Sequence, residues 1–463
     1  MRIKSVIFSA IFLAALATPV AAWDTSRSIV RIKSNLVGQT VIQAICAQLQ
    51  CQVLHSLDSL PGETGPSSLF VVRNLPAPSL SVNYDLLGIE AVEPDLPAWL
   101  ADEPWGVSQA TAAVLDALAD HTPATYYGST AWRSYLGQPA STIVRASDAH
   151  CTLRATGGGT VAIVDTGVDV DHPTLAPVLT AGYDFTRDVA GGDERADAGG
   201  SRGVTPDSVY GVSQATAAVL DQATAAVLDD STLVDFGHGT MVAGVVHLVA
   251  PTAHIMPLKA FAADGTGYTS DIIRAIVYAG RSGANVLNMS FSRRTPSAEL
   301  KRAIDNAAGL GVIAVASAGN DGRPTLMYPA AYDNVMGVAS TADDDTRSSF
   351  SNYGSNFVWV AAPGEGIITT YPWGTFAGAW GTSFSAPMVS GAAALLVGLE
   401  STATYGQVSS AVAQAQPLTP DLGNGRLDLF QAVSAGRGLW PDAAESPIPD
   451  TCDSSHVDWA TGP

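Results

Sequence analysis

Short apolar runs alternate with amphipathic stretches along the chain from about residue 128 onward. The runs lack polar alternation, which is typical of parallel strands that are buried on both faces of a sheet. The stretches between them carry apolar residues at helical spacing. This pattern predicts an α/β domain with a mostly parallel sheet, whose functional residues lie beyond the carboxyl ends of the strands. The predicted strands are residues 161–164, 255–258, 286–289, 312–315, 335–338 and 357–360, and the predicted helices are 239–249, 270–281 and 297–310.

A second pattern occupies residues 23–98, where four short strands are predicted together with two helices. The predicted order is β-α-β-β-α-β, which is that of a small ferredoxin-like module. Its strands are expected at 28–33, 51–55, 69–72 and 89–95, and its helices at 41–49 and 80–87.

Residues 1–22 have the pattern of a secretory signal peptide. Arg2 and Lys4 precede an apolar segment at 6–17, and the small residues at 20–22 predict cleavage before Trp23. Later stretches fall short of the roughly 18 consecutive apolar residues that a membrane span requires. We therefore expect an exported protein, either extracellular or periplasmic, that does not insert into a membrane.

The composition narrows the choice of partners. The 463-residue chain is 47% apolar and 14% charged, which suits one large folded domain and a smaller one. Its 43 acidic and 23 basic residues give a net charge of −20. Such a chain repels polyanions, so nucleic acid and anionic membranes are not expected partners. We expect a monomer.

Four cysteines fit an oxidising compartment. Cys46 and Cys51 lie close together near the N-terminus, whereas Cys151 and Cys452 lie far apart. If the N-terminal region is removed, pairing within each couple leaves no odd thiol. We therefore predict the disulfides Cys46–Cys51 and Cys151–Cys452, the second of which would tether the C-terminal tail.

Residues 99–127 join the two predicted units and contain a repeated sequence. The segment 106–116 recurs unchanged at 211–221, and its last eight residues occur once more at 222–229. We interpret the copies as an Ala-rich helical spacer tolerated in two surface connections, because surface loops accept added length at low entropic cost.

These patterns divide the chain into a series of segments. We predict a signal peptide at 1–22, the small module at 23–98, the junction at 99–127, the α/β domain at 128–438 with an insertion at 183–236, and a Pro-rich acidic tail at 439–463.

Four polar residues lie at predicted strand ends or helix starts, where a parallel sheet concentrates function. They are Asp165, His238, Asn320 and Ser383. A serine hydroxyl needs an adjacent base to act as a nucleophile, and an imidazole held by a buried carboxylate is such a base. A side-chain amide can donate to an oxyanion beside the backbone N–H of Ser383.

The motifs around these residues resemble those of the subtilisin-like serine proteases, the subtilases. They are Asp165-Thr-Gly167, Gly237-His-Gly-Thr240, Ala318-Gly-Asn320 and Gly381-Thr-Ser-Phe-Ser-Ala-Pro387, in the order found in that family. The resemblance implies a three-layer subtilisin-like fold and a secreted serine endopeptidase. Its triad would be Asp165, His238 and Ser383, with Asn320 as the oxyanion donor.

Two further segments resemble subtilase elements. Ser290, Phe291 and Ser292 match the segment that pairs with the substrate backbone and walls the P1 pocket. Residues 23–98, which close in Val92-Glu-Pro-Asp95, resemble the inhibitory propeptide. The resemblance implies a zymogen that cuts itself between about residues 100 and 127, with polypeptides as substrates and its own propeptide as an intramolecular inhibitor.

The resemblance implies no cofactor for catalysis, and it leaves structural Ca²⁺ open. Acidic side chains offer hard oxygen ligands, but EF-hand spacing is absent and acidic loops are more often solvated than metal-bound. The candidates are Asp184, Asp188, Asp193, Glu194 and Asp197, and the backbone carbonyls of Ala330, Tyr332 and Val335, which match a weak cation site of some subtilases.

Other hydrolase classes fit the sequence poorly. An aspartic protease needs a second Asp-Thr/Ser-Gly and an all-β fold. An α/β-hydrolase carries its acid and its histidine after the serine in the chain, whereas Asp165 and His238 both precede Ser383. A zinc peptidase needs His-Glu-x-x-His, which does not occur. The alternative that stays open is a catalytically silent subtilase-fold binding protein, although such a protein would normally lack a triad member.

Overall fold

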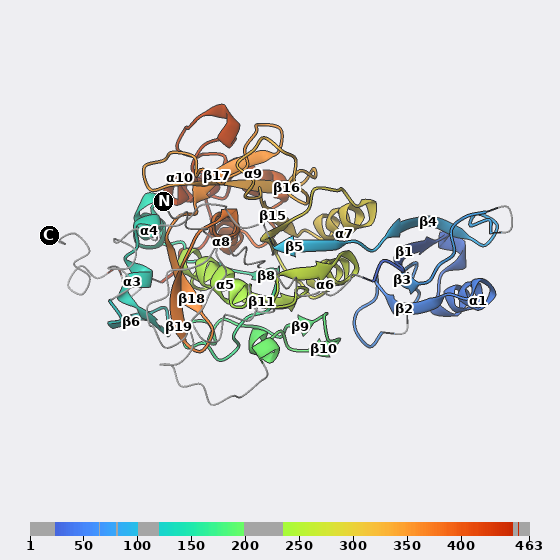
Figure 1. Cartoon of the computed structure of the whole chain (residues 1–463). Coiled ribbons are helices and arrows are strands. Elements are labelled where there is room, and N and C mark those ends of the chain that lie inside the picture. Colours follow the sequence, from blue (N-terminus) through green and yellow to red (C-terminus); the bar gives the residue numbers. More distant parts are fainter. Residues whose placement is uncertain are drawn as a thin grey trace, which may run out of the picture.

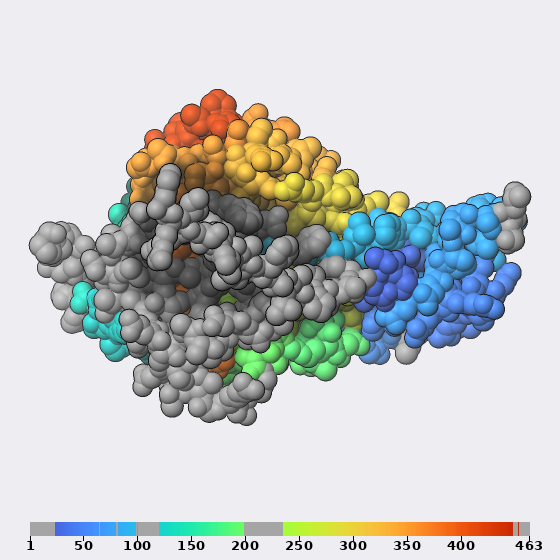
Figure 2. Space-filling model, in the orientation of Figure 1, coloured from blue at the N-terminus to red at the C-terminus, as the bar shows by residue number. Residues whose placement is uncertain are grey.

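The computed structural model describes residues 24–63, 65–79, 82–100, 120–198, 235–447 and 452. A large α/β domain carries a small N-terminal unit on one side (Figure 1). In the space-filling view this unit projects from the body of the molecule (Figure 2).

Eight strands form the central sheet in the order β10-β9-β11-β8-β13-β15-β16-β17. All neighbours pair in parallel except β9 and β10, which form a short antiparallel hairpin at one edge. The strands are β8 (Thr160–Asp165), β9 (Tyr183–Asp184), β10 (Val189–Ala190), β11 (His254–Lys259), β13 (Val286–Met289), β15 (Ile313–Ser317), β16 (Val335–Thr341) and β17 (Val358–Pro363).

Helices cover both faces of this sheet. The helices α5 (His238–Val249) and α8 (Thr382–Leu399) share one hydrophobic cluster, and α6 (Thr269–Arg281) and α7 (Ala298–Gly309) share the other. Side chains of β8 alternate between the two clusters, because successive residues of a strand point to opposite faces. The prediction of a three-layer α/β fold with a mostly parallel sheet is confirmed.

The prediction missed elements that lack a long apolar run. Short strands of Thr, Gly and Ala carry little periodic signal, so they read as loops. These elements are β5 (Pro97–Leu100), β6 (Pro123–Tyr126), β7 (Ser129–Trp132), β12 (Thr266–Tyr268), β18 (Ile367–Tyr371), β19 (Thr375–Ala379), α3 (Arg133–Leu136), α4 (Pro139–Ile143), α9 (Tyr405–Val412) and α10 (Leu429–Leu439). The short strand β14 (Phe291–Ser292) lies within the segment at 290–292 that the resemblance implies.

The first part of the predicted insertion belongs to the domain itself. Residues 183–190 form the edge hairpin β9–β10, and a short 3₁₀ helix (Glu194–Ala198) follows it. The Val168 N–H donates to Gly192 O at 2.8 Å, so this segment returns to the end of β8. The repeats at 106–116 and 211–229 and the signal peptide lie outside the described residues.

The N-terminal unit is an antiparallel sheet in the order β2-β3-β1-β4 with one helix packed on it. Its elements are β1 (Arg27–Ile32), α1 (Gln39–Leu49), β2 (Gln52–Ser56), β3 (Leu69–Arg73) and β4 (Ile89–Pro94). The second helix predicted at 80–87 is wrong, because the described residues 84–88 form a turn. Gly88 has a φ of 80°, and its left-handed conformation ends the turn and leads the chain into β4.

Carboxylates of the N-terminal unit cap two helices of the domain. Asp95 accepts hydrogen bonds from the Ser270 N–H (2.9 Å) and hydroxyl (2.8 Å) in the first turn of α6. Glu93 accepts from the Ala298 N–H at 3.1 Å, at the start of α7. A negative charge at a helix N-terminus satisfies amides that have no intrahelical partner. The N-terminal unit therefore contacts the domain through these hydrogen bonds as well as through apolar side chains of its sheet.

Both predicted disulfides, Cys46–Cys51 and Cys151–Cys452, are formed, which confirms the pairing. The tail also contacts the domain through Arg154, whose side chain donates to Ser446 O at 2.9 Å and pairs with Glu445. One helix of the described chain, α8, is long and apolar enough to cross a membrane by composition. However, 94% of that window is buried inside the fold, as expected of a core helix.

Three histidines are buried around the C-terminal half of α5 and the strands β7 and β19. His150 Nε2 lies 2.8 Å from Val249 O, His172 Nε2 lies 2.9 Å from Thr375 O, and His247 Nε2 lies 3.4 Å from Ser129 Oγ. Burial lowers the pKa of His150 and of His172 to about 4, and the pKa of His247 to about 3. All three are therefore neutral in the folded protein near pH 7.

We predict that these histidines destabilise the fold in acid. Below about pH 6.5 these histidines bind protons in the unfolded chain, whereas they stay neutral in the folded chain. Each histidine therefore lowers the free energy of unfolding by up to about 1.4 kcal/mol per pH unit, down to about pH 4. Denaturant unfolding at several pH values would measure the slope. His150→Gln should reduce it, whereas His254→Gln, at an exposed position, should not. An unchanged slope in His150→Gln would contradict the account.

Candidate active site

Asp165 and His238 make the central contact of the site. Asp165 is the fully buried last residue of β8, and His238 is the first residue of α5. The imidazole Nδ1 lies 2.8 Å from Asp165 Oδ1, which also accepts from the Thr166 N–H at 2.8 Å. Because an ionised carboxylate only accepts hydrogen bonds, Nδ1 carries the proton and Nε2 is left as the basic nitrogen.

Opposing effects set the pKa of His238. Burial lowers this pKa, but the charge of Asp165 and the hydrogen bond to it raise it more, and the pKa lies above its ordinary value of 6.5. The charges of Asp235 and Glu194 act in the same direction as Asp165. A raised pKa makes the imidazole a better proton acceptor.

Ser383 lies at the start of α8, and its backbone carbonyl accepts a side-chain hydrogen bond because Pro387 has no N–H to donate to it. Pro387 lies inside the helix and has no N–H, so it cannot donate to the carbonyl of Ser383 four residues earlier. Ser290 Oγ donates to that carbonyl instead, at 2.9 Å. The hydroxyl of Ser383 in turn lies 3.3 Å from Ser290 O, its one hydrogen bond within the described chain.

A buried polar chain fixes Ser290 from the sheet side. Ser390 Oγ donates to Asn288 Oδ1 at 2.8 Å, and Asn288 Nδ2 donates to Ser290 Oγ at 3.0 Å. All three side chains are fully buried. Since buried polar groups must be paired, this chain ties the end of β13 to α8 in one geometry.

The amide of Asn320 is oriented by the residue before Ser383. Asn320 Oδ1 accepts from the Thr382 N–H at 3.0 Å and from its hydroxyl at 2.9 Å. The NH₂ group is therefore the end of the amide left to donate elsewhere. The N–H of Ser383 belongs to the first turn of α8, where amides lack intrahelical acceptors. Together these groups can form a two-donor oxyanion site.

A strand that follows the N-terminal unit lies between two strands of the domain, one of which follows Ser290 directly in the chain. The segment β5 pairs antiparallel with β12 on one side and with β14 on the other. Leu100 is opposite Phe291 in β14, and its N–H donates to Gly265 O at 3.0 Å. Two edge strands that accept a third between them are a peptide-binding arrangement. The ring of Phe291 packs 5.1 Å from that of Phe261.

The structure thus brings the sequence-predicted residues into one site. Asp165 contacts His238, the ring of His238 lies 5.5 Å from the ring of Phe384 next to Ser383, and Asn320 contacts Thr382. Sequence reasoning missed the strand β12, because Gly267 within it and Gly265 just before it give no apolar signal. The glycine spacing was the one available hint.

Four of the five carboxylates considered as Ca²⁺ ligands pair with basic side chains, and the fifth, Glu194, accepts from hydroxyl and backbone N–H groups. Asp184 pairs with Arg187, Asp188 with Arg274, Asp193 with Arg195, and Asp197 with both Arg187 and Lys259. In the described ranges no three acidic, His or Cys side chains are grouped to hold a metal ion. A structural Ca²⁺, including one at the carbonyls of Ala330, Tyr332 and Val335, stays a prediction.

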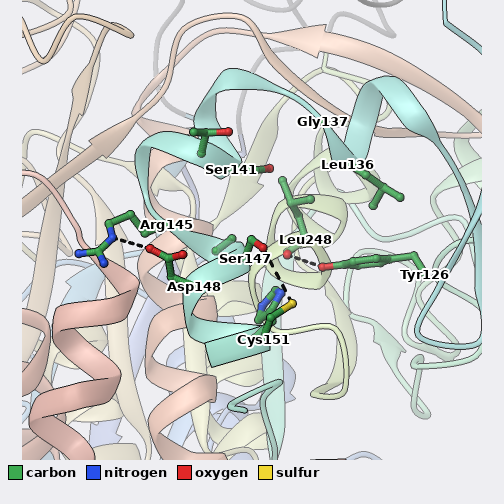
Figure 3. Close-up of a pocket in the computed structure, with 12 residues that line it drawn as sticks. Tyr126, Leu136, Gly137, Ser141, Arg145, Ser147, Asp148, Cys151 and Leu248 are labelled. Atoms are coloured by element: carbon green, nitrogen blue, oxygen red, sulfur yellow. Dashed lines mark hydrogen bonds and ion pairs between the residues drawn. The ribbon is translucent and has the colours of Figure 1, made fainter. Parts of the chain in front are cut away.

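A separate cavity of about 300 Å³ lies at the other end of α5 (Figure 3). Leu248 and His150 contribute to its lining, as do Tyr126 and Arg145. Leu248 is ten residues along α5 from His238, and a helix rises 1.5 Å per residue, so the two lie roughly 15 Å apart. The cavity is not part of the Asp165–His238 site.

Comparison with known proteins agrees with this geometry. The model of the subtilase family matches residues 156–431. Subtilisin BL of Lederbergia lenta is 41% identical over 169 residues, which are 35% of this chain and 62% of that protein. Thermitase of Thermoactinomyces vulgaris is 34% identical over 294 residues, 60% of this chain and 88% of its own length. A thermophilic serine proteinase of Bacillus sp. (strain AK1) is 31% identical over 299 residues, 61% of this chain and 63% of that protein.

The matched stretch thus spans less than two thirds of subtilisin BL but most of thermitase. The family match begins within the α/β domain and includes Asp165, His238, Asn320 and Ser383. On this evidence the chain belongs to the subtilase family.

Proposed function

We propose that this protein is a secreted serine endopeptidase that cleaves polypeptides through Ser383, His238 and Asp165. The observation that carries the proposal is the 2.8 Å contact between His238 Nδ1 and Asp165 Oδ1, made beside the serine at the start of α8. Membership of the subtilase family supports it, and one relative is named a serine proteinase.

In the first half of the reaction, Ser383 Oγ attacks the peptide carbonyl while His238 Nε2 takes its proton. The attack forms a C–O bond to Ser383 Oγ and places a negative charge on the former carbonyl oxygen; the ester forms when this oxygen re-forms the carbonyl and the C–N bond breaks. The N–H of Ser383 and the NH₂ of Asn320 donate to that oxygen, and Asp165 stabilises the imidazolium. When the C–N bond breaks, the imidazolium gives its proton to the leaving amine.

In the second half, water replaces the amine. His238 accepts a proton from the water as it attacks the ester, and returns that proton to Ser383 Oγ when the acid product leaves. The same oxyanion donors serve both steps.

The N-terminal unit would act as an intramolecular inhibitor that the enzyme removes from itself. Three contacts support this role: β5 pairs with β12 and β14 as a peptide substrate would, and Asp95 and Glu93 cap α6 and α7. The described strand ends at Leu100, and we place the cut between about residues 100 and 127. The secretion and monomeric state predicted from the sequence are part of the proposal.

We predict that Ser383→Ala abolishes labelling by a fluorophosphonate probe, because the probe reacts with an activated serine hydroxyl. Ser385→Ala removes a hydroxyl from the same turn, one that donates to Pro363 O at 3.2 Å, and should retain labelling. Gel detection of the secreted proteins measures both. A processed wild-type protein that takes up no label would favour the catalytically silent binding protein.

We predict that the secreted wild-type protein begins between about residues 100 and 127, whereas Ser383→Ala begins at Trp23. The variant lacks the nucleophile for its own cleavage, so its N-terminal unit stays attached. N-terminal sequencing of both proteins gives the answer. Active wild-type enzyme that still begins at Trp23 would contradict the zymogen proposal.

We predict that kcat/KM falls in acid with a midpoint above pH 6.5. His238 must be neutral to accept the serine proton, and Asp165 raises its pKa above that value. A pH profile measured with a soluble peptide substrate tests this. A midpoint clearly below pH 6.5 would show that the carboxylate does not outweigh burial.

A further inference from the structure

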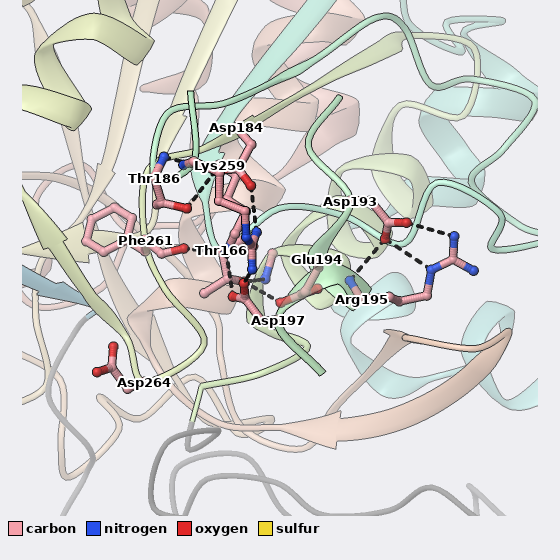
Figure 4. A network of polar contacts seen from close by, with 12 residues as sticks. Thr166, Asp184, Thr186, Asp193, Glu194, Arg195, Asp197, Lys259, Phe261 and Asp264 are labelled. Carbon is pink, nitrogen blue, oxygen red and sulfur yellow. Dashed lines mark hydrogen bonds and ion pairs between the residues drawn. The ribbon is translucent and has the colours of Figure 1, made fainter. Parts of the chain in front are cut away.

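Glu194 lies directly behind the Asp165–His238 pair and is fully buried. It comes from the short 3₁₀ helix after the edge hairpin, within a network of polar contacts shown in Figure 4. The proposed mechanism does not use it. A buried carboxylate is costly unless it is fully hydrogen-bonded, so its partners are informative.

Both oxygens of Glu194 face donors. Oε1 accepts from the Gly237 N–H at 2.7 Å and from the Thr166 hydroxyl, and Oε2 accepts from the Thr240 N–H at 3.2 Å and hydroxyl at 2.6 Å. A backbone N–H can only donate, and each oxygen faces one. The arrangement therefore fits an ionised carboxylate.

These donors lie next to Asp165 at the end of β8 and next to His238 at the start of α5. Thr166 follows Asp165, whereas Gly237 and Thr240 lie on either side of His238 in the chain. The Thr166 hydroxyl also accepts from the Gly239 N–H at 2.9 Å. One carboxylate thus ties the end of β8 to the first turn of α5.

A buried cation balances the charge of this site. Lys259, at the end of β11, is fully buried, and its Nζ donates to Thr166 O (2.8 Å), Phe261 O (2.6 Å) and Asp197 Oδ2 (2.7 Å). Burial raises the pKa of Glu194 and lowers that of Lys259, and the charges of the two favour ionisation of both. Lys259 therefore places a positive charge next to Thr166, the residue that links Asp165 and Glu194.

We propose that Glu194 is a positioning residue for catalysis, which holds Asp165 and His238 in register and adds negative charge behind the imidazole. The inference rests on the proposed protease function. The charged groups that face His238 are Asp165 from β8, Asp235 from the loop before α5, and Glu194 from the 3₁₀ helix. Lys259 from β11 opposes them through its contact with the Glu194 network.

The test is Glu194→Gln, which keeps the shape of the side chain but replaces one acceptor oxygen with a donor. The new NH₂ group would face a backbone N–H, so one hydrogen bond is lost together with the negative charge of Glu194. We expect kcat to fall about 10- to 100-fold with little change in KM, in line with the loss of an orienting carboxylate behind a functional group. We also expect the acid limb of the pH profile to move to lower pH, because less negative charge stabilises the imidazolium.

A matched control is Asp428→Asn. Asp428 is also a buried carboxylate at a helix start, where it accepts from the Gln431 N–H at 2.9 Å and pairs with Arg145. Asparagine caps helices as well as aspartate does, so this variant should keep both kcat and the acid limb. Loss of packing alone would not move the acid limb. The pH profile therefore distinguishes a positioning role of Glu194 from a general loss of stability.

The inference is overturned if folded, processed Glu194→Gln keeps wild-type kcat and an unmoved acid limb. If that variant does not fold, Thr166→Val provides the second test, since it removes the Thr166 ties to Glu194 and Gly239 while leaving the charge in place. It should lower kcat without moving the acid limb, and an unchanged kcat would overturn the inference. Failure of the protease proposal itself would appear separately, as wild-type protein without activity or label.

Discussion

The whole site depends on close backbone contacts between segments of the chain, at positions where no side chain would fit. A Cβ on Gly239 would lie 2.0 Å from Gly167 O, and a Cβ on Gly167 would lie 2.6 Å from Gly192 O. Neither distance can be met by a real side chain. Glycine at both positions lets the loop after β8, the first turn of α5 and the segment before Glu194 close onto one another. The 2.8 Å contact between Asp165 and His238 is a consequence of that closure.

Such closure buries polar groups, and the structure pairs them across elements. Asn288, Ser290 and Ser390 are linked from β13 to α8, and Thr166 links β8 to α5. The first link reaches Ser390 in the interior of α8, whereas the second joins the end of β8 to the first turn of α5, where amides lack regular partners. In the interior a satisfied polar network specifies one arrangement more narrowly than apolar packing does. The same groups that orient the reacting side chains therefore also fix the helices relative to the sheet.

The sequence predicted much of this architecture because the central strands are continuous apolar runs and the four motifs stand at their ends. It placed Asp165, His238, Asn320 and Ser383 on the correct elements, since parallel strands point their carboxyl ends to one edge. It could not show that Glu194 lies behind Asp165, because 28 residues separate Thr166 from Glu194 and only the fold brings them together. The turn at 84–88 and the strand β12 escaped prediction for a related reason, as local composition there gives little signal for the structure that tertiary contacts impose.

The docking of the N-terminal unit uses groups that the domain leaves unsatisfied at its surface. The edges of β12 and β14 offer free strand hydrogen bonds to β5, and the first turns of α6 and α7 offer amides to Asp95 and Glu93. In the proposed zymogen, water or a substrate strand would satisfy the same groups after removal of the unit. Arg27 binds Asp95 at 2.8 Å within the unit and also donates to Ser270 at 2.8 Å, so its charge belongs to both sides of the contact. Apolar side chains of the unit's sheet, among them Ile29, Leu57 and Val71, are buried in the same hydrophobic cluster as α6 and α7, so the contact combines apolar packing with these hydrogen bonds. In the proposed zymogen the covalent connection would strengthen this contact further, because tethering raises the effective concentration of the two surfaces.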